Sequence, residues 1–208
     1  MQTEFQKKVL NENYKINAHL ITSCTDILLT ENNPIDTDVL WVGSIKKIKQ
    51  PGKYIQLCQM LPDYKFRMLG AKPLSSGFEN VTKVDGVELS CVSNLDYVGF
   101  VPYHEVNPHF KRCRVYVNTS ESEGFPNTFL QAWANGVPTV SFFDPGVDWA
   151  GEKVGFVVST MGEMKEVVDR LMVDEDFYCR NSALSYDYVK NNCRVDVATS
   201  KYLDLFSA

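Results

Sequence analysis

Residues 115–143 read VYVNTSESEGFPNTFLQAWANGVPTVSFF and contain the most informative order of elements in this chain. A β-rich run, residues 115–119, ends in a small, acidic turn with one glycine, and this turn opens a helix. Gly136 closes the helix before a second β-rich run, residues 138–143. In parallel α/β sheets, the corner between a strand and a helix N-terminus is where anionic ligands bind. The sequence therefore predicts a ligand site at this corner.

Short β-rich runs alternate with helical patterns on both sides of this corner. Strands that alternate with helices are typical of a parallel, doubly wound sheet, so we expect an α/β fold, a Rossmann-like α/β/α sandwich. Residues 71–94, which contain several glycines and asparagines, are expected to form loops around a weak element. The other expected strands are residues 39–43, 64–70, 95–101 and 155–158, and the other expected helices begin at Pro51, cover residues 103–113 and fill most of residues 161–206.

The first 37 residues do not follow this alternation. Residues 6–14 have a helical pattern, residues 19–22 resemble a short strand, and residues 32–34 form a polar link. We therefore separate residues 1–37 from the α/β unit, residues 38–208.

Composition excludes several classes of protein. The net charge of −5 and the pI near 5.3 argue against a nucleic-acid-binding or polybasic membrane surface. The six cysteines form no C-x-x-C pair, and several lie in apolar runs, such as Cys58 and Cys91, which we interpret as small buried hydrophobic residues. Together with the lack of a signal-peptide pattern, this favours a reduced, cytoplasmic chain.

The corner sequence closely resembles the signature of retaining glycosyltransferases of the GT-B fold, E-G-F-x-x-x-x-x-E-A-x-A-x-G-x-P. Glu123 matches the first glutamate, and Gln131 stands at the position of the second. The resemblance covers nearly the whole chain but only half of the family's architecture. It implies that residues 1–37 are the hinge segment that enters from an acceptor-binding N-terminal domain. Residues 38–208 are then the nucleotide-sugar-binding domain.

The resemblance also implies roles for the residues of the corner. Glu123 would accept hydrogen bonds from hydroxyls of the donor sugar, because a carboxylate accepts two O–H donors at once. The alternative for Glu123 alone is a helix cap. Gln131 would hold the ribose with one acceptor oxygen where the family's glutamate has two. Backbone groups at the helix start would bind the pyrophosphate, with Pro126 in the first helical turn; they belong to Gly124, Phe125, Pro126, Asn127 and Thr128.

The loop after residues 39–43 is the second part of the implied donor site. The family places Gly-Arg and then a lysine here, and both cations clamp the pyrophosphate. Gly43 and Lys49 match, but Ser44 replaces the arginine and cannot make its bidentate, charged contact. Lys46 and Lys47 are candidates to compensate for it. Backbone groups at Val98, Gly99 and Phe100 resemble those that pack against the nucleotide base.

No metal and no cofactor are expected beyond the nucleoside-diphosphate sugar that serves as donor substrate. Two D-x-D patterns, residues 36–38 and 174–176, are interpreted as solvated turns. The expected partners are the donor and an acceptor-binding domain outside this chain. Any contact with the inner membrane face would be made by other parts of the full enzyme.

The predicted function is therefore the donor-binding half of a glycosyltransferase, which transfers a sugar with retention and is inactive as this chain alone. Glu123 and Lys49 would be its catalytic residues. One alternative is a non-catalytic scaffold descended from such an enzyme, which Ser44 and Gln131 favour. Another alternative is a sugar-nucleotide epimerase of the same fold, whose own motifs are not evident.

Overall fold

The computed structural model describes residue 2, residues 4–25 and residues 34–207. Its main feature is a sheet of six parallel strands in the order β12-β9-β8-β1-β2-β7. This order confirms the expected doubly wound α/β fold. The strands are β1 (Thr37–Val42), β2 (Phe66–Leu69), β7 (Leu95–Gly99), β8 (Cys113–Asn118), β9 (Thr139–Ser141) and β12 (Phe156–Val157).

The chain runs outward from β1 in both directions of the sheet. It first adds β2 and β7 on one side, then returns to the centre to place β8 beside β1 and continues to β9 and β12. The register pairs Val39 with Val115 and Leu40 with Tyr116. The loops that follow β1 and β8 therefore leave the same edge of the sheet, at the point where the strand order reverses; we refer to this point as the crevice.

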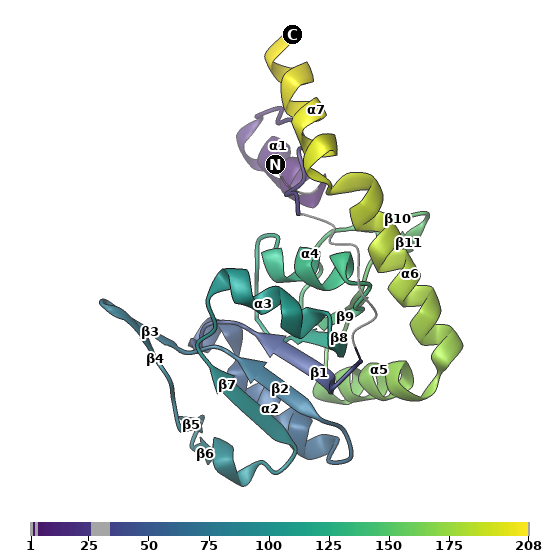
Figure 1. The fold of residues 1–208 in the computed structure, drawn as a ribbon. Helices are drawn as coiled ribbons and strands as arrows, with labels where there is room; N and C mark the ends of the chain where they lie inside the picture. The colour runs from purple at the N-terminus through teal and green to yellow at the C-terminus, as the bar shows by residue number, and fades with distance from the viewer. Residues whose placement is uncertain (1, 3, 26–33, 208) are drawn as a thin grey trace.

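Alternate residues of the central strands pack on opposite faces of the sheet, as the period of a strand requires. Val39 and Trp41 of β1 belong to the core under α2 (Pro51–Met60) and α5 (Met161–Val173). Leu40, between them, belongs to the core on the other face. That face is covered by α3 (Tyr103–Phe110), α4 (Asn127–Ala134) and α6 (Glu175–Asn192) (Figure 1).

The helix boundaries follow from local chemistry. Pro51 is the first residue of α2, where its missing N–H costs nothing, and Asn94 Nδ2 donates to carbonyls at the end of the same helix. Gly136 ends α4 in the left-handed region with φ of +66°. The long helical pattern expected after Met161 is divided into α5, α6 and α7 (Val195–Ser207), and Asp174 caps α6 by accepting from the Phe177 N–H.

The segment between β2 and β7 contains more regular structure than expected. It forms two hairpins and a short 3-10 helix, η2 (Leu89–Cys91), and the first hairpin projects from the body of the protein (Figure 1). A similar small hairpin, β10 (Asp148–Trp149) with β11 (Glu152–Lys153), follows β9. The hairpins between β2 and β7 are β3 (Lys72–Leu74) with β4 (Gly77–Glu79), and β5 (Lys83–Val84) with β6 (Val87–Glu88).

The N-terminal segment differs from expectation in one respect. Helix α1 (Glu4–Tyr14) is present, but the strand expected at residues 19–22 is wrong, because this segment has no sheet partner. Instead, the Thr22 hydroxyl donates to the Asn192 carbonyl and the Thr25 N–H to the Cys193 carbonyl. The segment thus packs against the end of α6. Of the polar link expected at residues 32–34, the first two residues lie outside the described residues.

Within residues 2, 4–25 and 34–207, no helix combines the length and the apolar character that a membrane crossing requires.

The edge of the sheet opposite the crevice is held by an ionic cluster around Asp36. Its carboxylate contacts Arg67 at 3.0 Å and Arg112 at 2.6 Å, and it accepts from the Thr37 hydroxyl. Partial burial raises the pKa of Asp36, but the Thr37 hydrogen bond and the two arginines lower it more, and the net pKa is below the ordinary value.

We expect Asp36→Asn to lower the free energy of unfolding by about 1–2 kcal/mol at pH 7, the size of a charge-assisted contact. Because the pKa of Asp36 is lower in the folded state, its stabilising contribution is complete above the unfolded pKa of about 3.9 and disappears as the pH falls through the folded pKa. Denaturant unfolding of both proteins from pH 7 to pH 3 measures this. A difference between them that stays constant below pH 4 would contradict the prediction.

Candidate functional site

The crevice between β1 and β8 brings together the two residues expected to be catalytic. Lys49 lies at the end of a short 3-10 helix, η1 (Lys47–Lys49), in the loop after β1, and Glu123 lies in the turn after β8. The Lys49 ammonium forms an ion pair with Glu123 Oε1. The Ser120 hydroxyl donates to the same oxygen at 2.7 Å. The Lys49 side chain is 28% exposed and the Glu123 side chain is 15% exposed. The ion pair is therefore accessible to a ligand but partly shielded from water.

Buried hydrogen bonds hold the lysine loop against the turn. Thr119, fully buried after β8, accepts from Trp41 Nε1 at 3.0 Å and donates to the Lys49 carbonyl at 2.8 Å. The Glu121 N–H donates to the Ile48 carbonyl at 3.0 Å. The backbone at Lys49 is therefore fixed by two strands and a turn, although its side chain lies in a surface loop.

The start of α4 presents free backbone donors beside this pair. Pro126 precedes the helix in an extended conformation with ψ of 127°, so the expectation that it lies in the first helical turn is wrong by one residue. No side chain caps the helix, which leaves Glu123 free of the capping role that was the alternative for it. The first backbone bond of the helix runs from the Phe129 N–H to the Pro126 carbonyl, and no bond from the Asn127 or Thr128 N–H is present among the described residues. These two N–H groups are suited to an anion.

The turn itself is fixed by its apolar and small residues. Phe125 is 8% exposed and packs against Trp133, so it anchors the turn while its backbone remains at the crevice. The Ser120 N–H donates to the Asn118 side chain at 2.9 Å. Gly124 lies between these anchors. The residues that sequence reasoning missed are Ser120 and Thr119, whose only signal was their place directly after a buried strand.

Gln131 lies on α4 and is only 7% exposed. Its backbone carbonyl accepts from Asn135 Nδ2, but its side-chain amide has no hydrogen-bond partner among the described residues. Neither amide atom of Gln131 is among the buried unpaired side-chain atoms of the described residues, so the amide reaches the surface and is available to a ligand.

The third part of the expected site, around Val98, Gly99 and Phe100, contains two backbone groups that are hydrogen-bonded within the protein. The Gly99 carbonyl accepts from the Gly70 N–H at 2.8 Å, and the Phe100 N–H donates to Asn80 Oδ1 at 2.8 Å. These backbone groups therefore already have protein partners. Val98 is 39% exposed on the outer strand β7.

A largely apolar cavity of about 380 Å³ nevertheless lies next to this segment. It extends from Gly43 and Ser44 to Phe100, and Phe78 of the projecting hairpin stacks on Phe100 with 4.3 Å between ring centroids. The cavity could hold a flat, apolar ring.

Neither D-x-D pattern has the arrangement of a metal site. Asp36 belongs to the arginine cluster, and Asp174 caps α6. The described residues contain no group of three or more His, Cys, Asp or Glu side chains placed to share a metal ion. The six cysteines are all unpaired; Cys58 is buried as expected, whereas Cys91 is exposed, so its interpretation as a buried residue was wrong.

Comparison with known proteins assigns this chain to a family. Residues 36–174 match the family described as glycosyl transferases group 1. An uncharacterized glycosyltransferase from Haemophilus influenzae is 26% identical over 203 residues, which cover 89% of this chain and 56% of that protein. The chain thus spans about half the length of its relative.

Solved structures share the fold. HepE from Anabaena in complex with UDP superposes with a TM-score of 0.77 at 14% identity, over 99% of this chain and 62% of its own. A sucrose-phosphate synthase from Thermosynechococcus elongatus gives a TM-score of 0.75 at 15% identity, over 99% and 57%. The present chain corresponds to one half of such a GT-B fold.

We expect Thr119→Val to lower the free energy of unfolding by about 2–4 kcal/mol, because the Trp41 N–H and the Lys49 carbonyl lose their partner at a buried site. Thr199→Val is a matched control; the Thr199 hydroxyl bonds only to the Val195 carbonyl on exposed α7, so its effect should stay within about 0.5 kcal/mol. Denaturant unfolding measures both. Equal effects of the two substitutions would show that Thr119 does not hold the lysine loop.

Proposed function

The chain belongs to the glycosyl transferases group 1 family, and from this membership we propose that it is the donor-binding half of a glycosyltransferase. The observation that carries the proposal is the pairing of Lys49 with Glu123 in the crevice between β1 and β8. Two opposite charges from separate loops meet at the place where doubly wound sheets bind nucleotides. Since the chain spans only about half of its relative, the activity of the whole protein is part of the proposal.

We propose that the donor lies along the edge of the sheet. The free N–H groups of Asn127 and Thr128 and the ammonium of Lys49 would bind the pyrophosphate, which needs donors and positive charge. Glu123 would accept hydrogen bonds from the sugar. The unpartnered amide of Gln131 would face the ribose, and the apolar cavity beside Phe100 would take the base. UDP is the first candidate, because HepE was solved with it.

In the proposed reaction, the bond between the anomeric carbon and the diphosphate oxygen breaks while an acceptor oxygen bonds to that carbon and passes its proton to an oxygen of the leaving diphosphate. The departing diphosphate gains negative charge, which Lys49 and the helix N–H groups are placed to stabilise. We propose that transfer occurs with retention, without a metal or a cofactor, as the family resemblance implies.

Binding of a donor would change the Lys49–Glu123 pair. In the structure each charge neutralises the other, and the Ser120 hydroxyl donates a second hydrogen bond to Glu123. A donor would supply the phosphates to Lys49 and hydroxyls to Glu123, so that the two side chains exchange partners. The pair keeps both residues ordered before the substrate arrives, which reduces the cost of binding.

A non-catalytic scaffold remains the second candidate. Ser44 lacks the charge of the family's arginine, and Gln131 lacks one acceptor oxygen. A thermal-shift and calorimetry screen of this chain against UDP, UDP-glucose and UDP-N-acetylglucosamine distinguishes the two. Binding of UDP, with a further change on adding the sugar, supports the donor site, whereas no binding of any of them favours the scaffold.

Lys49→Ala should weaken UDP binding by about tenfold, the effect of one charge-assisted contact of roughly 1.5 kcal/mol. UMP binding should change much less, because the contact is with the second phosphate. Calorimetry with both nucleotides tests this, with Lys190→Ala as a control for the loss of one exposed lysine. Equal losses for UDP and UMP would remove Lys49 from the pyrophosphate site.

Gln131→Glu restores a second acceptor oxygen and should tighten UDP binding by about 0.5–1.5 kcal/mol, the net worth of one hydrogen bond. The gain should shrink for deoxy-UDP, which lacks the 2′-hydroxyl. The new carboxylate also repels the pyrophosphate, but the ribose between them keeps that effect smaller. If calorimetry finds the same change for UDP and deoxy-UDP, residue 131 does not face the ribose.

A further inference from the structure

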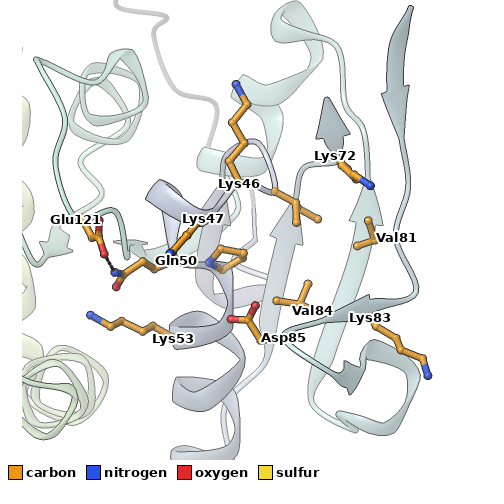
Figure 2. Close-up of a pocket in the computed structure, with 12 residues that line it drawn as sticks. Lys46, Lys47, Gln50, Lys53, Lys72, Val81, Lys83, Val84, Asp85 and Glu121 are labelled. Carbon is orange, nitrogen blue, oxygen red and sulfur yellow. Dashed lines mark hydrogen bonds between the residues drawn. The ribbon is translucent and has the colours of Figure 1, made fainter. Parts of the chain in front are cut away.

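The two sides of the crevice are joined both at the surface and in the interior. At the surface, Gln50 Nε2 in the loop after β1 donates to the Glu121 carboxylate in the turn after β8 (Figure 2). In the interior, the hydroxyl of Tyr116 on β8 lies 3.2 Å from the Val42 carbonyl and 3.0 Å from Thr128 Oγ1. The interior contact therefore joins the end of β1 to the first turn of α4, and the proposed pyrophosphate site lies at these two ends.

The Tyr116 side chain is held in place by the core. It is fully buried, and its ring packs edge-to-face against Phe110 and Phe129, with 5.2 and 5.9 Å between ring centroids. Burial raises the pKa of Tyr116 well above its ordinary value, and the hydrogen bond with the Thr128 side chain lowers it less. The Tyr116 hydroxyl therefore keeps its proton at neutral pH and is a donor at a fixed position.

The two hydroxyls, Tyr116 and Thr128, can share their protons in two ways. Each hydroxyl has one proton to donate and can also accept. If Tyr116 donates to the Val42 carbonyl, the Thr128 hydroxyl can donate to the Tyr116 oxygen. If Tyr116 donates to Thr128 instead, the Thr128 proton can point to an acceptor outside the pair. Rotation of the two O–H bonds exchanges these arrangements, so no carbon, nitrogen or oxygen atom needs to move.

An anion at the start of α4 would favour the second arrangement. Thr128 is half-buried, and it is the second residue of α4, where the backbone N–H groups are suited to an anion. An ionised oxygen is a stronger acceptor than a backbone carbonyl. With such an oxygen next to the Thr128 hydroxyl, Tyr116 would donate to Thr128 and Thr128 to the anion. Hydrogen bonds in a chain of this kind strengthen one another.

We propose that Tyr116 is a positioning residue of the donor site, which directs the Thr128 hydroxyl toward the diphosphate. Tyr116 is buried and touches no part of the donor; it acts through Thr128. The Val42 carbonyl accepts the Tyr116 proton before the diphosphate binds, and Thr128 accepts it afterwards. This inference rests on the proposed function, because the anion that it requires is the diphosphate of the donor.

A matched control for Tyr116 lies on the other face of the sheet. Tyr54 is also fully buried, and its hydroxyl lies 2.9 Å from the carbonyls of Val39 and Arg67. It belongs to the core beneath α2, whereas Tyr116 belongs to the core beneath α4. Tyr54→Phe and Tyr116→Phe each remove one buried hydroxyl next to a strand carbonyl, so a general loosening of the core would affect ligand binding in both variants.

Calorimetry with UDP on the 208-residue chain and on these two variants tests the proposal. Tyr116→Phe should weaken UDP binding about fivefold to tenfold, the fold-change that corresponds to one hydrogen bond. Tyr54→Phe should change it less than about twofold. Equal losses in the two variants, or a Tyr116→Phe protein that binds UDP as tightly as the unmodified chain, would overturn the positioning role.

Substitutions of Thr128 show whether Tyr116 acts through this hydroxyl. Thr128→Val removes the hydroxyl at nearly constant shape and should weaken UDP binding by at least as much as Tyr116→Phe. Thr128→Ser keeps the hydroxyl and should bind UDP at least about threefold tighter than Thr128→Val. The double variant Tyr116→Phe/Thr128→Val should bind UDP as tightly as Thr128→Val, within about twofold. Losses that add in the double variant would mean that the two residues act independently, which contradicts the proposal.

The unmodified chain distinguishes failure of this inference from failure of the proposed function. If the unmodified chain does not bind UDP, the donor site is wrong, and the role of Tyr116 is overturned with it. If the unmodified chain binds UDP but Tyr116→Phe has no effect, the donor site stands and only the role of Tyr116 is overturned.

Discussion

The parallel pairing of β1 with β8 is the constraint on which the rest of the structure depends. These strands are separated by β2 and β7 in the chain, yet they lie side by side at the centre of the sheet. Their register, Leu40 opposite Tyr116, brings the loop that carries Lys49 to the turn that carries Glu123. A shift of this register by one residue would exchange the buried faces of the strand and separate the two loops.

Buried hydrogen bonds fix the loop after β1 against the turn after β8. Thr119 joins the Trp41 indole to the Lys49 backbone where no water can substitute for a lost hydrogen bond. An apolar core alone would tolerate small movements of the loop, whereas a chain of buried hydrogen bonds has one favourable geometry. The exposed end of Lys49 is therefore placed by interactions that lie beneath it.

The loop after β1 has a different environment on each side. Toward α3, Gly43 and Ser44 border the apolar cavity that includes Phe100. Toward α2, Lys46 and Lys47 border a second cavity of about 740 Å³. The projecting segment between β2 and β7 contributes to both cavities, with Phe78 in the first and Lys72 and Lys83 in the second. One loop and one pair of hairpins thus contribute to two cavities that border the cores on opposite faces of the sheet.

The sequence by itself determined the alternation of strands and helices, the strand–turn–helix corner and the position of Glu123 in that corner, because period, turn residues and a motif are local properties. It misplaced Pro126 by one residue and predicted a strand at residues 19–22, where a short apolar pattern had no sheet edge to join. Only the tertiary structure decided that Lys49 pairs with Glu123, that Asn80 accepts from the Phe100 N–H, and that Lys46 and Lys72, from distant segments, line one cavity. These contacts join residues far apart in the chain, so they depend on strand order and hairpin docking, which no local pattern specifies.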